Sequence, residues 1–253
     1  MAARDGAPRG ATEESTAFDG SLSRGESRLR DAVAEAFPRG RWREPAGAFG
    51  LLAHRLKIRG ERGSTRAWPA GCRDALFVDL ETLGFVGRPL FLIGVLEPVG
   101  PAGARLCQYL ARNYAEERDM IAGFLKRHGG ARRWITFNGK SFDLPHLLDR
   151  CRYHRLDPPG PEGHDDLLHR ARRVWKGVLP DCRLQTLESR VCGVWRSNDL
   201  AGVGVPRAYH EFVLTGEARG MIRILDHNRG DLLTLGKLYR IIEDADREAE
   251  DGS

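Results

Sequence analysis

Cysteine and lysine are both scarce in this sequence. Only five of the 253 residues are cysteine, and they are scattered without any CxxC pair. An odd number of scattered cysteines argues against a disulfide framework and against a zinc ribbon, so we expect reduced and mostly buried thiols. Only five of the 40 basic residues are lysine, and the other 35 are arginine.

The excess of arginine has two explanations. The planar guanidinium group binds two phosphate oxygens at once, so arginine suits a partner that carries phosphates. The net charge of +5 and the isoelectric point near 9.1 agree with such a partner without proving one. A GC-biased genome would produce the same excess, and the composition alone does not separate the two.

Long hydrophobic runs are also absent. No apolar stretch approaches the roughly 20 residues that cross a bilayer, and residues 1–20 lack the apolar segment of a signal peptide. We therefore expect a cytoplasmic protein. Hydrophobic residues still make up 41% of the sequence, which is enough for the core of one sizeable domain.

The first 73 residues differ in character from the rest of the chain. Residues 1 to about 25 are rich in Gly, Ala, Ser, Thr and charged residues, which is typical of a disordered leader. The pattern then predicts a short amphipathic helix over 26–37 and one strand over 51–58. We interpret residues 1–73 as a disordered leader with a short N-terminal appendage.

From Asp74 onward the sequence predicts an α/β domain. Three apolar runs separated by Gly and Pro, "ALFVDL", "PLFLIGVL" and "RLCQYLA", predict strands in hairpin order. A helix over 116–128, a strand over 133–138 and a series of helices follow. We expect a mixed central sheet with flanking helices and a helical C-terminal half over residues 74–242, and an acidic tail over 243–253 that frays.

Two acidic residues lie within the first of these strands. Asp79 and Glu81 in "FVDLETLGF" are two positions apart, so their side chains point to the same face of the strand. Two like charges that converge in a core are unfavourable unless a cation lies between them. The spacing therefore indicates a bound metal.

Further candidate ligands have simpler explanations when each is taken alone. Asp143 follows the turn "NGKSF" at the start of a predicted helix, where an aspartate often serves as an N-cap. His227 and Asp231 are four residues apart on one helical face, and such pairs are more often solvent-exposed than functional. Asp165 and Asp166 also precede a helix, and capping is the favoured interpretation of both.

Five phrases, taken in order, resemble the DEDD superfamily of exonucleases, and most closely its YprB-type ribonuclease H-like domains. They are "FVDLETLGF", "FLIGV", "NGKSFDLPHL", "HDDLLHRARRVWKGVLPDCRLQTLE" and "HNRGDLLTL". The resemblance covers about residues 74–242 and implies an α/β ribonuclease H-like fold. It also implies four acidic ligands for two Mg²⁺ or Mn²⁺ ions, since hard carboxylate oxygens suit these metals: Asp79, Glu81, Asp143 and Asp231.

The activity that this resemblance implies is a 3′→5′ exonuclease acting on a single-stranded DNA or RNA end. Members of the superfamily carry a Tyr four residues before the last Asp or a His five before it, whereas His227 stands four before Asp231. His227 is therefore either a catalytic residue that handles the attacking water or a structural one. Asn138 and Lys140, in the turn before Asp143, are candidate substrate contacts.

Two other functions stay open at this point. One is a catalytically silent nucleic-acid-binding module of the same fold, and the other is a structure-selective endonuclease. A basic helix face, which could follow a phosphate backbone or could simply be solvated, is formed by His169, Arg170, Arg172, Arg173 and Lys176. The sequence reveals no stacking platform for bases and no reader of the 2′-hydroxyl, so it does not distinguish DNA from RNA.

Overall fold

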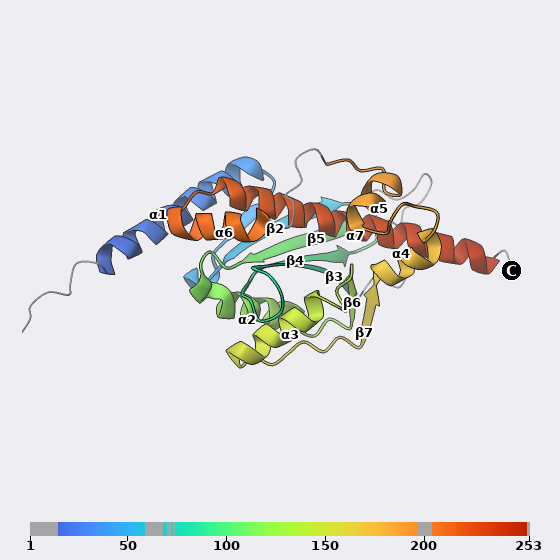
Figure 1. Ribbon diagram of the computed structural model, residues 1–253, viewed down its shortest axis with the longest axis horizontal. Helices are drawn as coiled ribbons and strands as arrows, with labels where there is room; N and C mark the ends of the chain where they lie inside the picture. The colour runs from blue at the N-terminus through green and yellow to red at the C-terminus, as the bar shows by residue number, and fades with distance from the viewer. Residues whose placement is uncertain (1–14, 59–67, 70–71, 73, 197–203, 252–253) are drawn as a thin grey trace, which may run out of the picture.

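Figure 1 shows the computed structural model, which describes residues 15–58, 68–69, 72, 74–196 and 204–251. The α-helices are α1 (Ser15–Ala36), α2 (Glu117–His128), α3 (Asp143–His154), α4 (Leu167–Trp175), α5 (Leu184–Arg190), α6 (Gly204–Thr215) and α7 (Arg219–Asp251). The strands are β1 (Arg41–Arg43), β2 (Gly50–Lys57), β3 (Ala75–Thr82), β4 (Leu90–Val99), β5 (Gly103–Leu110), β6 (Arg133–Thr136) and β7 (Gly163–Asp166). Short 3₁₀ turns lie at Pro45–Gly47 and Tyr114–Glu116.

The strands form one mixed sheet in the order β1-β2-β5-β4-β3-β6-β7. Strands β3, β4 and β5 are consecutive antiparallel neighbours, which confirms the predicted hairpin order. Strands β6 and β7 extend the sheet on the other side of β3, and both pairings there are parallel. The predicted mixed central sheet and the helical C-terminal half are therefore confirmed.

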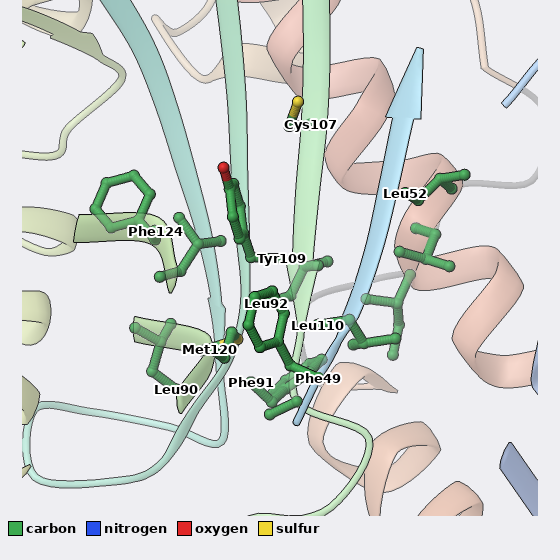
Figure 2. Packing of buried hydrophobic residues seen from close by; sticks show 14 of the residues in the cluster. Phe49, Leu52, Leu90, Phe91, Leu92, Cys107, Tyr109, Leu110, Met120 and Phe124 are labelled. Atoms are coloured by element: carbon green, nitrogen blue, oxygen red, sulfur yellow. The ribbon is translucent and has the colours of Figure 1, made fainter. Parts of the chain in front are cut away.

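Helices cover both faces of the sheet (Figure 1). Helix α7 contacts β3, β4 and β5 from one face, and α2 contacts β4 and β5 from the other. Between the layers lies a cluster of buried side chains that includes Tyr109 of β5, Phe124 of α2 and Trp134 of β6. Figure 2 shows part of this cluster, in which Phe49 and Leu52 belong to the same group as Tyr109 and Phe124.

The predicted boundary at residue 74 was wrong, because it cuts through one sheet. Strand β2 pairs with β5 along its whole length, from Gly50 opposite Leu110 to Lys57 opposite Gly103. An antiparallel strand with one neighbour leaves a row of unpaired N–H and C=O groups, and β2 satisfies this edge of β5. Helix α1 also begins at Ser15, inside the expected leader, and contacts α6 and α7. Residues 1–14 lie outside the described part.

Three further elements differ from the sequence expectation. Helix α6 was missed because Gly204 and Pro206 open it, although the buried Val205, Tyr209 and Phe212 follow a helical spacing. Strand β7, "GHDD", is too short and polar to be recognised. The acidic tail remains helical to Asp251, since Arg170 of α4 forms ion pairs with Glu243 and Asp246.

Two expectations about composition can be compared with the described residues. All five cysteines are unpaired, and four of them are buried, which confirms that most of the thiols lie in the core. None of the described helices has both the length and the apolar character that a membrane span requires.

The position of β2 inside the core leads to a prediction about stability. Leu52 is fully buried, so Leu52→Ala should lower the free energy of unfolding by about 2–5 kcal/mol. Thermal or urea unfolding of the whole chain measures this loss. Lys57→Ala, at the exposed end of the same strand, should change it by less than about 0.5 kcal/mol. If Leu52→Ala were as stable as the wild type, the interpretation of residues 1–73 as an appendage would be correct.

Candidate active site

Strand β3 presents Asp79 and Glu81 on the sheet face that α7 covers. Asp79 lies opposite Gly94 of β4, and the register shifts between Glu81 and Thr82, where the pairing of the two strands becomes irregular. A Cβ atom on Gly94 would lie 2.1 Å from the Asn228 side-chain oxygen, so only glycine lets α7 approach so closely. The Asn228 amide donates a hydrogen bond of 2.8 Å to the Asp79 carboxylate.

A buried hydrogen-bond chain holds Asn228 in place. The side-chain Nε2 of Gln108, on β5, donates to Asn228 Oδ1 at 2.9 Å and to the Leu225 carbonyl at 2.8 Å. Because its oxygen is engaged in this way, Asn228 presents its N–H to Asp79. Sequence reasoning missed both amides, and the only signal of Asn228 was its place between His227 and Asp231.

Asp143 comes to the site from the start of α3. The N-cap of this helix is Phe142 and not Asp143, so the capping interpretation of Asp143 was wrong. Its carboxylate accepts a hydrogen bond of 3.1 Å from the Leu80 N–H, between Asp79 and Glu81 on β3. This bond ties the helix to the strand that carries the other two acids.

Asp166 fixes the turn that leads to Asp143. It is the N-cap of α4 and accepts from the Leu168 N–H at 3.1 Å, which confirms the capping interpretation. Its carboxylate also accepts from the backbone N–H groups of Asn138 at 2.7 Å and Lys140 at 3.1 Å. Asn138 has a positive φ of 62°, a conformation that asparagine tolerates better than most residues. Asp165 instead pairs with Arg133 and Arg170.

Helix α7 brings His227 and Asp231 to the same place. His227 Nε2 lies 3.6 Å from an Asp231 oxygen and 4.0 Å from a Glu81 oxygen. The side chains of His227 and Asp231 are only 15% and 14% exposed, so the interpretation of this pair as a solvated face was wrong. The spacing of four residues places both groups on the same face of the helix, and their low exposure shows that this face is turned into the protein.

Arg196 is a contact that the sequence did not reveal. Its guanidinium group forms an ion pair with Asp231, donates to Glu188 at 2.8 Å and donates to the His227 carbonyl at 3.1 Å. Asp231 therefore has a positively charged neighbour. Among the described residues, no three His, Cys, Asp or Glu side chains are gathered closely enough to enclose an ion. Arg196 therefore supplies positive charge beside the acids.

The acids influence one another electrostatically. The pKa of Asp79 is raised well above its ordinary value, first by removal from water and then by the charges of Asp231, Glu81 and Asp143. Removal from water raises the pKa of Asp143 to about 7, and the Leu80 hydrogen bond opposes this shift. The four acids thus form one interacting group, whose hard oxygen donors suit Mg²⁺ or Mn²⁺.

A cleft of about 1210 Å³ opens over these acids. Asp79, Asp143 and Asp231 line it, together with Asn138. Basic and aromatic side chains also line it: Arg172, Lys176, Arg183, Phe85 and Phe142. Phe85 is 84% exposed and Phe142 54% exposed, so the cleft holds two aromatic faces on which bases could stack, which sequence reasoning did not identify.

The expected basic helix face divides into separate parts. Arg172 and Lys176 line the cleft, whereas Arg170 is occupied by acidic partners. His169 and Arg173 lie around a neighbouring hollow, which also contains Lys140. Lys140 is thus close to Asp143 in the sequence, but its side chain lines a different depression from that of Asn138.

The repulsion around Asp79 gives a prediction about stability and pH. Because the folded-state pKa of Asp79 is raised, its charge destabilises the fold above pH 3.8. At pH 7.5 without metal, Asp79→Asn should melt at the same or a higher temperature than wild type. Each kcal/mol of repulsion that the substitution removes should raise the melting temperature by about 2–4 °C. The difference should shrink as the pH falls and vanish below about pH 3.8, where Asp79 is protonated in both the folded and the unfolded chain. Thermal melts across this range test the prediction.

Metal should act in the opposite direction. At 100 times its dissociation constant, Mn²⁺ should stabilise the wild type by about 2.7 kcal/mol and Asp79→Asn by clearly less. Asp157→Asn, at an exposed position after α3, is the matched control and should respond like the wild type. Equal metal-induced shifts in wild type and Asp79→Asn would show that Asp79 is not a ligand.

Comparison with known proteins places this geometry in a family. The model of the RNase_H superfamily matches residues 76–243. "Uncharacterized protein YprB" of Bacillus subtilis (strain 168) is 34% identical over 175 residues, which cover 66% of this chain and 41% of that protein. The chain therefore spans less than half the length of this relative.

Among solved structures, a match is the family B DNA polymerase from the hyperthermophilic archaeon Pyrobaculum calidifontis. It is 16% identical with a TM-score of 0.47, and the match covers 66% of this chain and 24% of the polymerase. The family match instead spans the strands and helices that bring the four acids together, from β3 to α7. The chain belongs to the RNase_H superfamily and is similar to YprB within it.

Proposed function

We propose that this protein is a metal-dependent nuclease that removes nucleotides from the 3′ end of a single strand. The observation that carries the proposal is the cleft in which three carboxylates, from Asp79, Asp143 and Asp231, lie together with arginine, lysine and exposed phenylalanine side chains. Such a cleft combines groups for metal binding, phosphate binding and base stacking. The 3′→5′ direction rests on the resemblance to DEDD exonucleases.

The proposed metal ligands are Asp79, Glu81, Asp143 and Asp231, which would hold two Mg²⁺ or Mn²⁺ ions. Bound ions of this kind make a water nucleophilic near neutral pH and stabilise charge on the leaving oxygen of a phosphodiester. The donor set fits them, because the other three acids raise the pKa of Asp79 and all four supply only hard oxygen atoms. Before metal binds, Arg196 compensates part of the charge of Asp231.

His227 is the proposed proton acceptor. Its Nε2 faces the carboxylates of Glu81 and Asp231, within 4.0 Å of each. Neutral imidazole can accept the proton of a water held between these acids, and the carboxylates then stabilise the imidazolium that results. The backbone carbonyl of His227 is held by Arg196, which fixes this turn of α7.

The remaining side chains of the cleft are proposed to position the strand. Phe85 and Phe142 would stack on the last bases, while Arg172, Lys176 and Arg183 would bind phosphates. Asn138 is a proposed contact to the terminal nucleotides. Lys140, in the adjoining hollow, would meet a phosphate only where the strand passes from the cleft into that hollow. A cytoplasmic location stays part of the proposal.

One observation favours the silent binding module as a second candidate. The ion pair between Arg196 and Asp231 holds a carboxylate that metal would need. If Arg196 never releases Asp231, the cleft binds a strand without cutting it. Retention of all four acids favours the nuclease.

A gel assay tests the proposal directly. Single strands of DNA and RNA, labelled at the 3′ or the 5′ end, are incubated with Mg²⁺, Mn²⁺ or EDTA. We expect a shortening ladder from the 5′ label, a labelled mononucleotide from the 3′ label, and no product in EDTA or with Asp231→Asn. Undiminished cleavage in EDTA would contradict the use of metal, and metal-independent binding without any cleavage would establish the silent module.

The role of His227 can be tested separately from metal binding. His227→Ala should lower kcat by about 10²-fold or more, because a general base contributes at least this much. The Mn²⁺ affinity, measured by calorimetry, should stay within about twofold of wild type, since a proton acceptor is not a ligand. His210→Ala, at an exposed position on α6, is the control. Wild-type turnover in His227→Ala would make His227 a structural residue.

A further inference from the structure

A second basic depression lies away from the cleft, near the end of the sheet formed by β1 and β2. It has a volume of about 470 Å³ and is bounded by β1, β2, β5 and the C-terminal end of α2. We call it the basic hollow and define it by the six arginines that line it: Arg39, Arg41, Arg43, Arg55, Arg105 and Arg127.

The strand register places the basic hollow on the opposite face of the sheet from the acids. Residues that lie directly opposite each other in antiparallel strands point to the same face. Asp79, Gly94, Gln108 and Leu52 are aligned in this way across β3, β4, β5 and β2. The neighbouring set, Val95, Cys107, Ala53 and Arg41, must point to the other face. The arginine side chains of β1 and β2 therefore belong to a surface separate from the cleft.

The positive charge of the basic hollow is compensated only in part. Arg105 and Arg127 both pair with Glu97, at 2.9 and 3.0 Å. Within the part of the chain that the structure describes, no ion pair is formed by Arg39, Arg41, Arg43 or Arg55, and all four are exposed. Glu97 thus pairs with two of the six guanidinium groups.

The arrangement of these arginines is unfavourable without a partner. Arg55 lies directly opposite Arg105 in the β2–β5 ladder, and like charges in that position destabilise a sheet. Arg41 and Arg43 stand two positions apart on β1, so their side chains leave the same face about 7 Å apart. The hollow presents a row of guanidinium groups on an extended backbone, which suits a row of anionic groups.

We propose that the basic hollow binds the phosphodiester backbone of a nucleic-acid strand, as a second contact distinct from the cleft. The proposal rests on the nuclease function proposed above, because the occupant is taken to be a more distant part of the same substrate. Arginine forks bind phosphate oxygens in pairs, and the concave shape allows several to reach one strand. The aromatic rings of this lining, His54 and Tyr109, are both buried, and Tyr109 is hydrogen-bonded to His128, so we expect the hollow to contact the charged backbone and not the bases.

The test compares two triple variants that lose the same charge. The first variant, called the hollow variant, removes three arginines of the basic hollow, with Arg41→Gln, Arg43→Gln and Arg55→Gln. The control removes three exposed arginines elsewhere, with Arg28→Gln, Arg152→Gln and Arg207→Gln. Binding of a fluorescein-labelled 40-nucleotide single strand is measured by anisotropy in EDTA, so that no cleavage is needed.

We expect the hollow variant to bind at least about tenfold more weakly than the control, because it loses three phosphate contacts. The slope of log K against log salt should fall by about 2, at about 0.7 per contact in a single strand. If the triple variant does not fold, Arg41→Gln and Arg55→Gln, measured singly, should each lower the slope by about 0.7. Equal binding by hollow and control variants overturns the proposal.

Cleavage assays separate this proposal from the nuclease function. For the hollow variant, KM for the 40-nucleotide strand should rise, while kcat and the KM for a six-nucleotide strand should match wild type. If wild type cleaves nothing yet the anisotropy difference persists, the nuclease function fails and the basic hollow stands. If poly-L-glutamate of equal charge displaces the strand as well as an unlabelled strand does, the hollow is a site for acidic protein and the proposal is overturned.

Discussion

Repulsion among four carboxylates is the constraint on which the site depends. Asp79, Glu81, Asp143 and Asp231 come from β3, α3 and α7, and the last three all raise the pKa of the first. The fold holds them together with groups that donate hydrogen bonds or carry positive charge. Asn228 donates to Asp79, the Leu80 N–H donates to Asp143, and Arg196 pairs with Asp231. Asp79, Asp143 and Asp231 therefore each have a compensating contact on a different structural element.

The close approach of α7 to the sheet makes this arrangement possible. Gly94 leaves room for the Asn228 side chain, and Gln108 orients the Asn228 amide from the neighbouring strand. A larger residue at position 94 would push α7 outward and move Asp231 and His227 with it. Asn228 takes part both in the packing of α7 on the sheet and in the electrostatics of the site, so a change in one alters the other.

Two groups of basic side chains lie on different sides of the sheet. Arg172, Lys176 and Arg183 line the cleft over the acids, where aromatic side chains are also exposed. The basic hollow contains arginines on a part of the sheet that lies beyond α2. Phosphate binding at both surfaces, as proposed, would account for part of the excess of arginine, which composition alone explains equally well by genome bias.

The sequence by itself determined the local features of this protein. The alternation in "FVDLETLGF" determined that Asp79 and Glu81 share a face of a strand, and the spacing of four determined that His227 and Asp231 share a side of a helix. The family resemblance, over about residues 74–242, covered nearly the same span as the match to the RNase_H superfamily over residues 76–243. These features depend on neighbours in the chain, which a sequence displays directly.

Only the tertiary structure decided which distant residues meet. The contact of Gln108 with Asn228, the ion pair of Arg196 with Asp231 and the pairing of β2 with β5 each join segments that lie far apart in sequence. It also decided that Lys140 lines a different hollow from Asn138, although only Gly139 separates them. No local pattern encodes such pairings, because long-range contacts form only when the whole chain packs around one core.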